Sequence, residues 1–198
     1  MKAKFFGRLV SCLLAIVASM ALGGCGAESK DAQSQDVGTS SAGVSTGMRL
    51  QIKSMSSQKC LDVAGGYTNP DNPIVQFTCH HGLNQQFQLY DTFNGFQIQS
   101  MLDLNMCVSI KSAWWNELVY LEPCVDANGW RPYTTRWYLD SSDLWSSVSH
   151  AELRTVAAPR GTQQYCIDVA SGLTWDSLWM QIYGCHHGLN QQWELSNW

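Results

Sequence analysis

The chain has 198 residues, of which 45% are hydrophobic and 14% charged, and its formal net charge at pH 7 is −4. An acidic chain argues against a nucleic-acid partner, because affinity for a phosphate backbone comes from clustered Lys and Arg. Beyond the N-terminal region no stretch is as long and apolar as a transmembrane helix requires, so none is predicted.

Residues 1–24 predict a secretory signal peptide. Lys2, Lys4 and Arg8 precede the apolar run Leu13–Leu22, which ends in small residues. Without this segment, nine Lys and Arg face sixteen Asp and Glu, which gives a formal charge of −7. The mature protein is therefore expected outside the cytoplasm and is more acidic than the full chain.

The end of the apolar run also predicts a lipid anchor. Leu22–Cys25 resembles the lipobox of bacterial lipoproteins, whose cysteine is acylated and becomes the mature N-terminus. An ordinary signal peptide with an incidental cysteine is the alternative. Residues 25–47, rich in Ser, Gly, Ala, Gln and Asp, predict a flexible tether. We expect lipidation at Cys25 and a place in the bacterial cell envelope, as an outer-membrane lipoprotein or at the cell surface, with the lipid as the membrane link.

The string CHHGLNQQ occurs twice, at Cys79–Gln86 and at Cys185–Gln192. Each copy closes a longer unit that opens with Cys, an aliphatic residue, Asp, Val and Ala, at Cys60–Ala64 and at Cys166–Ala170. Because repeats decide the architecture of a chain, they take precedence over a residue-by-residue assignment of secondary structure.

A weaker third unit lies between these two. It has CVSI at Cys107–Ile110, a second cysteine at Cys124 and TTRWYL at Thr134–Leu139. The domain is therefore expected to cover residues 48–198 as three repeats. Their ranges are about 48–92, 93–140 and 150–198. The longest insertion, Asp140–Ala151, has the composition of a surface loop.

With Cys12 in the signal peptide and Cys25 as the lipid site, six cysteines remain in the exported domain. An even number in an oxidising compartment favours disulfides, and six cysteines allow fifteen connectivities. The repeats favour pairing within each unit. The predicted disulfides are Cys60–Cys79, Cys107–Cys124 and Cys166–Cys185.

A metal site is the competing interpretation of Cys79, His80 and His81 with their counterparts in the third repeat. The sequence has no CxxC spacing, and adjacent histidines on an extended segment point in opposite directions. We therefore expect neither a metal nor another cofactor.

The local patterns predict an all-β chain. Short alternating runs such as Leu50–Ile52, Phe96–Ile98, Gln181–Tyr183 and Trp193–Leu195 are separated by clusters of Gly, Asn, Pro and Ser. No long segment keeps the period of a helix. Three similar β units, none of which covers its own apolar face alone, fit a closed architecture with pseudo-threefold symmetry.

The repeated Cys-[Leu/Ile]-Asp-Val opening, the aromatic-x-Cys and the Asn-Gln-x-[Trp/Phe] ending resemble the ricin-type β-trefoil lectin domain, known by its QxW repeats. The resemblance covers about residues 48–198 and implies a β-trefoil fold. The closing motifs are Gln85-Gln86-Phe87, Gln191-Gln192-Trp193 and the degenerate Thr135-Arg136-Trp137. By this resemblance, Phe87, Trp137 and Trp193 pack in the core.

The resemblance also implies a carbohydrate site in the third repeat. A carboxylate accepts sugar hydroxyls, amides donate to the sugar, and an aromatic face lies against the apolar side of the ring. Carried over residue by residue, the site consists of Asp168, Gln181, Tyr183, Asn190 and Gln191. Each Asp or Asn alone could instead be a turn-forming residue that bonds its own backbone.

The first repeat matches the same pattern with one departure. Its site residues are Asp62, Phe77, Asn84 and Gln85. Val75 stands where the third repeat has Gln181, and the neighbouring Gln76 faces the other way if the strand is regular, although a bulge could bring it into the site.

The second repeat departs from the pattern in two places. Ser109 replaces the aspartate, and Thr134 and Thr135 replace Asn-Gln. We expect no sugar binding of this kind there. The joint loss of both elements in one unit favours a shared functional role for them in the other two.

The histidine pairs have no assigned role. They are His80 with His81 and His186 with His187. They fit polar loop residues, and one of each pair could also border a pocket. A neutral imidazole there would donate to a sugar hydroxyl, so binding would weaken at acid pH.

The nine tryptophans exceed what the QxW positions use. The surplus aromatics are Trp114, Trp115, Trp130, Tyr133, Trp145, Trp175 and Trp179. If Trp114 and Trp115 lie on a strand, they face opposite sides, so at least one is exposed and marks a contact surface. Filling of the core and loop minicores is the alternative.

The sequence favours a non-enzymatic, surface-tethered protein that binds galactose-like or related glycans through its first and third repeats. The tether, the single trefoil and the surplus tryptophans also resemble the cell-binding A subunit of cytolethal distending toxins, which acts with a catalytic partner. Glycosidase chemistry needs two carboxyls about 5–10 Å apart. By the resemblance, Asp62 and Asp168 lie on different lobes, too far apart for that role.

Overall fold

The computed structural model describes residues 47–140, 150–158 and 161–197. The predicted signal peptide, Cys25, most of the predicted tether and Trp145 lie outside the described residues. So does most of the predicted surface loop, at 141–149. Within the described part of the chain, no helix is long and apolar enough to cross a membrane.

The described residues form short strands joined by loops and single 3₁₀ turns. The strands are β1 (Arg49–Ser54), β2 (Cys60–Val63), β3 (Asn72–Phe77), β4 (Phe87–Asp91), β5 (Phe96–Ser100), β6 (Asp103–Ile110), β7 (Val119–Pro123), β8 (Trp137–Leu139), β9 (His150–Thr155), β10 (Tyr165–Val169), β11 (Leu178–Gly184) and β12 (Gln192–Asn197). The 3₁₀ turns are η1 (Ala64–Gly66), η2 (Leu83–Gln85), η3 (Tyr133–Thr135), η4 (Ala170–Gly172) and η5 (Leu189–Gln191).

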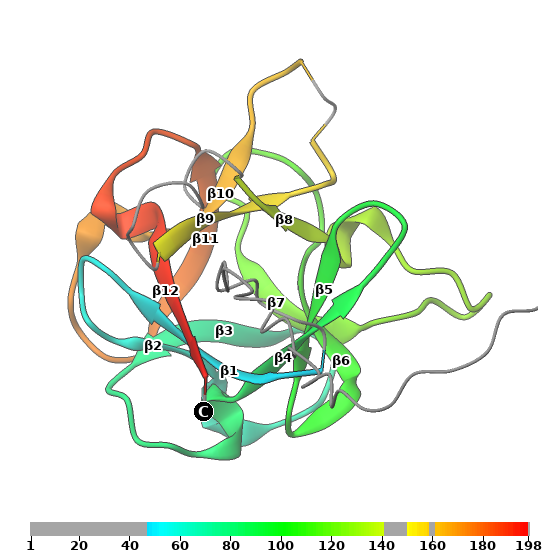
Figure 1. Cartoon of the computed structure of the whole chain (residues 1–198), viewed down its shortest axis with the longest axis horizontal. Helices are drawn as coiled ribbons and strands as arrows, with labels where there is room; N and C mark the ends of the chain where they lie inside the picture. The colour runs from blue at the N-terminus through cyan, green and yellow to red at the C-terminus, as the bar shows by residue number, and fades with distance from the viewer. Residues whose placement is uncertain (1–46, 141–149, 159–160, 198) are drawn as a thin grey trace, which may run out of the picture. The chain divides into compact units, whose positions relative to one another are not determined.

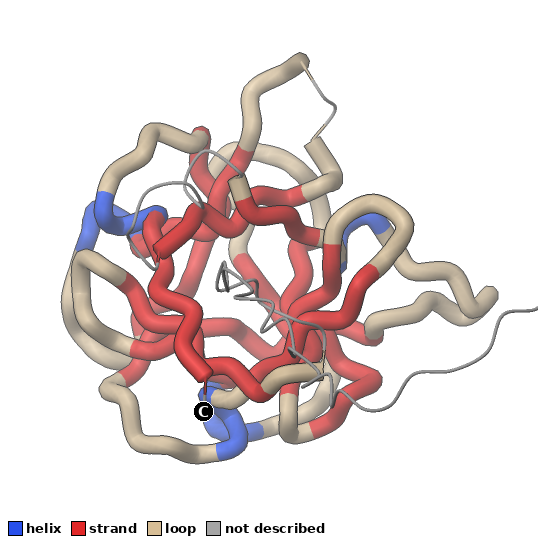
Figure 2. The backbone as a smooth tube through the Cα atoms, in the orientation of Figure 1, coloured by secondary structure: helices blue, strands red, loops and turns tan. Residues whose placement is uncertain are grey.

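The strands form a barrel with three hairpins beneath it. Strands β1, β4, β5, β8, β9 and β12 pair antiparallel in a closed ring. Hairpins β2–β3, β6–β7 and β10–β11 pair with one another through β3, β7 and β11. Figure 1 shows the three repeats, coloured in turn cyan to teal, green, and yellow to red, around one centre. Figure 2 shows the 3₁₀ turns at the periphery of the strands. This is the predicted β-trefoil.

The strand register repeats the same contact three times, which explains the threefold arrangement. The closing aromatic of each repeat pairs with a small hydroxyl residue of the next. The pairs are Phe87 with Ser100, Trp137 with Thr155, and Trp193 with Ser54. No repeat closes the barrel alone, because each end strand needs the first strand of the following repeat.

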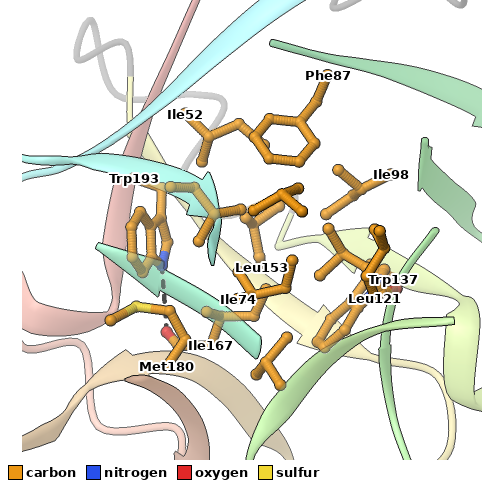
Figure 3. Close-up of a cluster of buried hydrophobic side chains, with 14 of the residues drawn as sticks. Ile52, Ile74, Phe87, Ile98, Leu121, Trp137, Leu153, Ile167, Met180 and Trp193 are labelled. Carbon is orange, nitrogen blue, oxygen red and sulfur yellow. Dashed lines mark hydrogen bonds between the residues drawn. The ribbon is translucent and has the colours of Figure 1, made fainter. Parts of the chain in front are cut away.

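The three closing aromatics are fully buried, as predicted. They enter one cluster from different sides, beside Ile52, Ile98 and Leu153 (Figure 3). The indole of Trp193 donates to the carbonyl of Ile167 at 3.1 Å, and that of Trp137 donates to the carbonyl of Val108 at 2.9 Å. These bonds let a large polar-edged ring fill the core without an unpaired N–H.

The three predicted disulfides are present: Cys60–Cys79, Cys107–Cys124 and Cys166–Cys185. Each ties the first strand of a hairpin to the segment that follows its second strand. Among the described residues, one group of possible metal ligands lies close together, Glu152 with Cys166 and Cys185. Its two sulfurs form a disulfide, so they do not supply thiolates to a metal.

Trp114 and Trp115 do not lie on a strand. Both lie in the loop between β6 and β7, where the N–H of Glu117 donates to the carbonyl of Trp114 and Asn116 has a φ of 62°. This turn breaks the alternation of a strand, so both indoles are exposed, at 74% and 61%. The prediction that at least one is exposed is confirmed.

Candidate functional site

The third repeat gathers four of its five predicted site residues around one carboxylate. Asp168 lies opposite Gln181 on the hairpin β10–β11, and the amide of Gln181 donates to Asp168 Oδ1 at 2.9 Å. The amides of Asn190 and Gln191, which turn η5 carries, donate to Oδ2 at 2.7 and 3.0 Å. The carboxylate is held by three donors from two elements and is only 2% exposed.

The fifth predicted residue, Tyr183, lies two positions along β11 on the same side of the strand as Gln181. Its ring contacts the imidazole of His186 edge-on at 6.0 Å between centroids. Nδ1 of His186 accepts from the N–H of Gly188 at 3.1 Å. In the neutral imidazole the proton therefore lies on Nε2, which is 3.8 Å from Asp168 Oδ2.

The first repeat builds the same constellation. The amide of Asn84 donates to both oxygens of Asp62 at 2.9 Å, and Gln85 donates to Oδ2 at 2.8 Å. His80 Nε2 is 3.4 Å from Oδ2, and its ring meets Phe77 edge-on at 5.8 Å. Asp62, Phe77, His80 and Asn84 line a cavity of about 250 Å³. One histidine of the pair thus borders the pocket, as the sequence allowed.

The departure in the first repeat is confirmed. Strands β2 and β3 pair regularly over four positions, so Val75 lies opposite Asp62 and no bulge intervenes. Gln76 points to the other side and is fully buried. Its amide donates to the carbonyls of Leu173 and Trp175 at 2.8 and 3.0 Å, and thereby holds a loop of the third repeat against β3.

Gln85 and Gln191 lie behind the aspartates and not on the pocket surface. Both are fully buried. Each donates to its aspartate and to a backbone carbonyl, and its oxygen accepts the N–H of the first histidine of the pair, His80 or His186. This geometry departs from the sequence expectation that these amides touch a sugar, because every amide atom is already bonded within the protein.

Burial raises the pKa of Asp62 above the ordinary value of 3.8, against the opposing effect of its bonds from Gln85, Asn84 and His80. Burial likewise raises the pKa of Asp168, against the bonds from Gln181 and Gln191 and the nearby His186. Both carboxylates are thus less acidic than a surface aspartate.

Glycines allow each histidine and asparagine to approach its aspartate. A Cβ at Gly82 would lie 2.5 Å from Asn84 Oδ1 and 2.7 Å from a ring carbon of His80. A Cβ at Gly188 would meet His186 and Asn190 at 2.5 and 2.7 Å. The Gly in CHHGLNQQ therefore has a steric reason that the sequence alone did not reveal.

The second repeat replaces this constellation with internal bonds. The hydroxyl of Ser109 donates toward the carbonyls of Ile110 and Thr134 at 3.1 and 3.2 Å. Thr135 accepts from the amide of Gln97 at 2.7 Å. The position of the aspartate therefore holds no carboxylate, and the neighbouring polar groups are paired.

A larger cavity of about 770 Å³ lies between Tyr138, Val156 and Gln164, away from these sites. Its described lining residues include no carboxylate. The cavities that contain or adjoin the aspartate sites are therefore the relevant ones.

Fold and site together define a β-trefoil of the lectin type, with a polar site on two of its three hairpins. The model of the ricin-type beta-trefoil lectin domain matches residues 48–151, and the chain belongs to this family. The match covers the first two repeats, and the threefold register extends the same architecture through β12. No curated protein matches the sequence.

Three solved structures illustrate the similarity. A designed threefold-symmetric protein, ThreeFoil, is 19% identical with a TM-score of 0.64, covering 76% of this chain and 99% of its own. A ricin B-like lectin of Macrolepiota procera in complex with lactose is 19% identical with a TM-score of 0.59, covering 78% and 98%. The C-half of an earthworm R-type lectin in complex with GalNAc is 18% identical with a TM-score of 0.55, covering 76% and 99%.

Proposed function

We propose that the protein is a non-enzymatic lectin that binds galactose-type glycans through its first and third repeats. The observation that carries this proposal is a buried aspartate held by neighbouring amides beside an aromatic ring, in two of the three repeats. The repeat that lacks the aspartate also lacks the amides. Their joint loss fits a unit in which the amides hold the carboxylate in place.

The bonding pattern leaves acceptor capacity for a ligand. Asp168 Oδ2 accepts from Asn190 and Gln191, whereas Oδ1 accepts from Gln181. A carboxylate has about four lone-pair sites, so Oδ1 retains one for a sugar hydroxyl. The ring of Tyr183 offers the apolar face, as Phe77 does in the first repeat. Galactose is the favoured sugar, because the similar Macrolepiota lectin binds lactose and the earthworm lectin binds GalNAc.

Calorimetry with galactose, GalNAc and lactose tests the proposal. The unmodified protein should bind two equivalents per chain. Asp62→Ala and Asp168→Ala should each remove one equivalent, and the double variant should remove both. Ser109→Ala, at the equivalent position of the second repeat, is the matched control and should leave binding unchanged. Absence of binding on a glycan array, or unchanged binding by the double variant, would refute the proposal.

A catalytic role for the aspartates has little support. Asp62 and Asp168 belong to different hairpins and different amide clusters, so they do not form a pair around one substrate. Hydrolysis of chromogenic galactosides, abolished by either substitution, would contradict the non-enzymatic assignment.

The proposed location is the bacterial cell envelope, with the domain tethered through a lipid on Cys25. The support is the lipobox-like sequence Leu22–Cys25 and the polar segment that follows it. In the native host, Cys25→Ser should release the protein from the membrane fraction and abolish incorporation of labelled palmitate. Incorporation that persists in this variant would exclude the anchor.

A second candidate is a cell-binding subunit of a toxin-like complex. Among the described residues, five exposed indoles favour a protein partner: Trp114, Trp115, Trp130, Trp175 and Trp179. Large exposed aromatics are typical of interfaces. A stoichiometric nuclease-like partner that co-purifies from native membranes would support this function, and an isolated monomer would argue against it.

A further inference from the structure

A cavity of about 400 Å³ shares Tyr183 with the third-repeat site. Its walls are Trp115, Gln163, Tyr165, Tyr183, Gly184 and Cys185. Tyr183 and Gly184 lie two and three residues beyond Gln181 along β11, roughly 7–10 Å at the rise of a strand. A volume of this size lies within the usual range of small-molecule pockets, about 300–1,000 Å³.

The tryptophan of this cavity comes from a different repeat. Trp115 belongs to the second-repeat loop, which docks on β11 because the N–H of Asn116 donates to the carbonyl of Ile182 at 3.1 Å. Its ring lies 5.4 Å from that of Tyr183, tilted by 60°. Trp115 is nevertheless 61% exposed, so one face of the indole remains open.

The threefold symmetry gives an internal comparison for this loop. The N–H of Ser177 donates to the carbonyl of Gln76 at 2.9 Å, as that of Asn116 does to Ile182. Both donors have a left-handed φ, of 61° and 62°. The residue before each donor is therefore equivalent, so Asp176 occupies beside the first site the position that Trp115 occupies beside the third.

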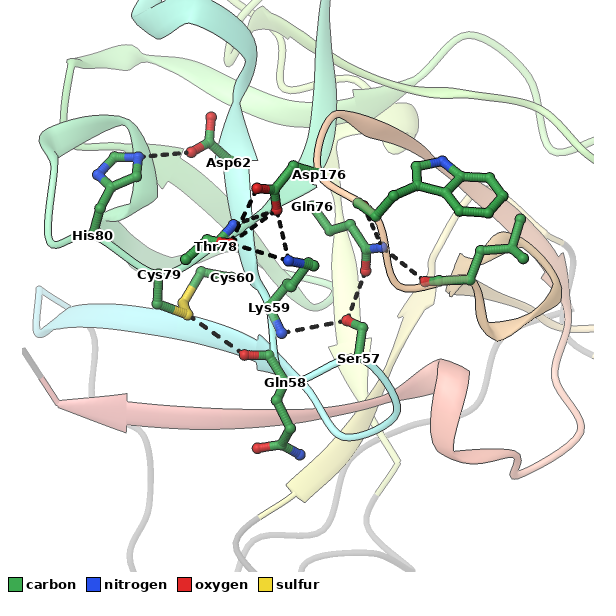
Figure 4. A network of polar contacts seen from close by, with 12 residues as sticks. Ser57, Gln58, Lys59, Cys60, Asp62, Gln76, Thr78, Cys79, His80 and Asp176 are labelled. Atoms are coloured by element: carbon green, nitrogen blue, oxygen red, sulfur yellow. Dashed lines mark hydrogen bonds and ion pairs between the residues drawn. A yellow bond between two sulfur atoms is a disulfide. The ribbon is translucent and has the colours of Figure 1, made fainter.

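In the first repeat this position makes polar bonds with its neighbours. Asp176 accepts from the N–H of Thr78 at 2.8 Å and pairs with the ammonium of Lys59 at 2.7 Å (Figure 4). Lys59 precedes the first cysteine of its repeat, as Tyr165 does in the third, and Thr78 precedes the second cysteine, as Gly184 does.

Beside the third site, each of these three polar residues, Asp176, Lys59 and Thr78, is replaced by a residue that lines the cavity. An ion pair becomes two aromatic rings, Trp115 and Tyr165, and a threonine becomes Gly184. The missing side chain also leaves room for Gln163, whose Nε2 would lie 2.9 Å from a Cβ at position 184. Two aromatic faces and one amide are a combination that suits a sugar ring.

Resting on the lectin function proposed above, we infer that the third-repeat site continues into this cavity and binds a second sugar residue on Trp115. The third site is thus selective for galactose-terminated oligosaccharides. The first site, closed by Asp176 and Lys59, recognises the terminal sugar alone.

The test uses variants with one active site each. Asp62→Ala leaves the third site and Asp168→Ala leaves the first. Calorimetry compares galactose with a panel of galactose-terminated di- and trisaccharides of different linkages. At the third site the best oligosaccharide should bind about tenfold more tightly than galactose, and at the first site within about twofold.

Trp115→Ala in the Asp62→Ala background should abolish the gain and leave galactose binding unchanged, whereas Trp115→Phe should keep part of the gain. Trp114→Ala, the exposed neighbour outside the cavity lining, is the matched control and should keep all of it.

The outcomes separate the two proposals. If neither one-site variant binds galactose, the lectin function itself fails. Galactose binding without any oligosaccharide gain at the third site would overturn the second subsite alone. Survival of the oligosaccharide gain in Trp115→Ala would also overturn the second subsite. Loss of galactose binding in that variant would overturn it too, since Trp115 would then belong to the primary site.

Discussion

At the scale of single residues, the site depends on two aspartates that are nearly buried yet remain acceptors. Burial of a carboxylate is costly unless hydrogen bonds compensate it. The amides of Asn84 and Gln85 supply these bonds in the first repeat, and in the third repeat Gln181 adds another. Gln85 and its counterpart thus fix the carboxylate in place, so their contribution to binding is positional.

The raised pKa values of Asp62 and Asp168 predict that sugar binding weakens with acid before an ordinary aspartate would titrate. A protonated carboxyl loses acceptor capacity, so affinity should fall as the pH decreases toward 3.8, with the midpoint above that value. Because the folded pKa exceeds the unfolded one, the contribution of these groups to stability is largest below pH 3.8 and is lost as the pH rises through the folded pKa. Acid should therefore weaken binding without destabilisation from these two groups.

Calorimetry with galactose over the acid range, with urea unfolding at each pH, measures both effects. His80→Gln and His186→Gln separate the aspartates from the histidines, since a fall that disappears in these variants would belong to the imidazoles. A flat affinity down to pH 3.8 would contradict the prediction.

The orientation of side chains was predictable from the sequence where the strands are regular. The alternation of side chains along β3 correctly predicted that Gln76 points away from Asp62, because successive side chains of a strand point to opposite faces. The burial of Gln85 and Gln191 was beyond such reasoning, since it depends on the path of the short turns η2 and η5 beneath the hairpins.

At the scale of elements, each hairpin loop docks on the hairpin of the next repeat. The loops ending at Asp71, Asn116 and Ser177 donate to the hairpin strand of a neighbouring repeat, at 2.9–3.1 Å. Asp176 and Trp115 reach neighbouring sites in this way. Such bonds join residues of different repeats, so the local pattern could not reveal them. The disulfides lie within single repeats, so the internal repeat predicted them.

Among single side chains, the closing aromatics are predicted to contribute most to the free energy of unfolding. Trp137→Ala should lower the free energy of unfolding by about 3–5 kcal/mol, because it empties a fully buried site and leaves the carbonyl of Val108 unpaired. Trp114→Ala, in an exposed loop, should change it by less than about 0.5 kcal/mol. Urea unfolding of the oxidised protein measures both, and similar values for the two variants would refute the assignment of Trp137 to the core.

At the scale of the whole molecule, the trefoil holds two unequal sites on one body. The barrel and the hairpins form a continuous antiparallel network, so the first and third sites keep a fixed separation. The symmetry of the fold provides three equivalent positions. One holds Asp62 beside the polar bonds of Asp176, one holds Asp168 near the cavity lined by Trp115, and one has Ser109 and no carboxylate.

This arrangement predicts avidity on a surface that carries many galactose groups. When one site is bound, the second binds at a high effective concentration, so the apparent affinity should exceed that of either site by roughly a hundredfold or more. On a dense galactose-coated sensor, Asp62→Ala or Asp168→Ala should therefore lower the apparent affinity by a much larger factor than the same substitution lowers the affinity for free galactose in solution. On a sparse coating, where the two sites cannot reach neighbouring sugars together, the same variants should differ little from the unmodified protein. Equal losses on the two coatings would show that the sites act independently, and the fixed geometry of the trefoil would then have no role in recognition.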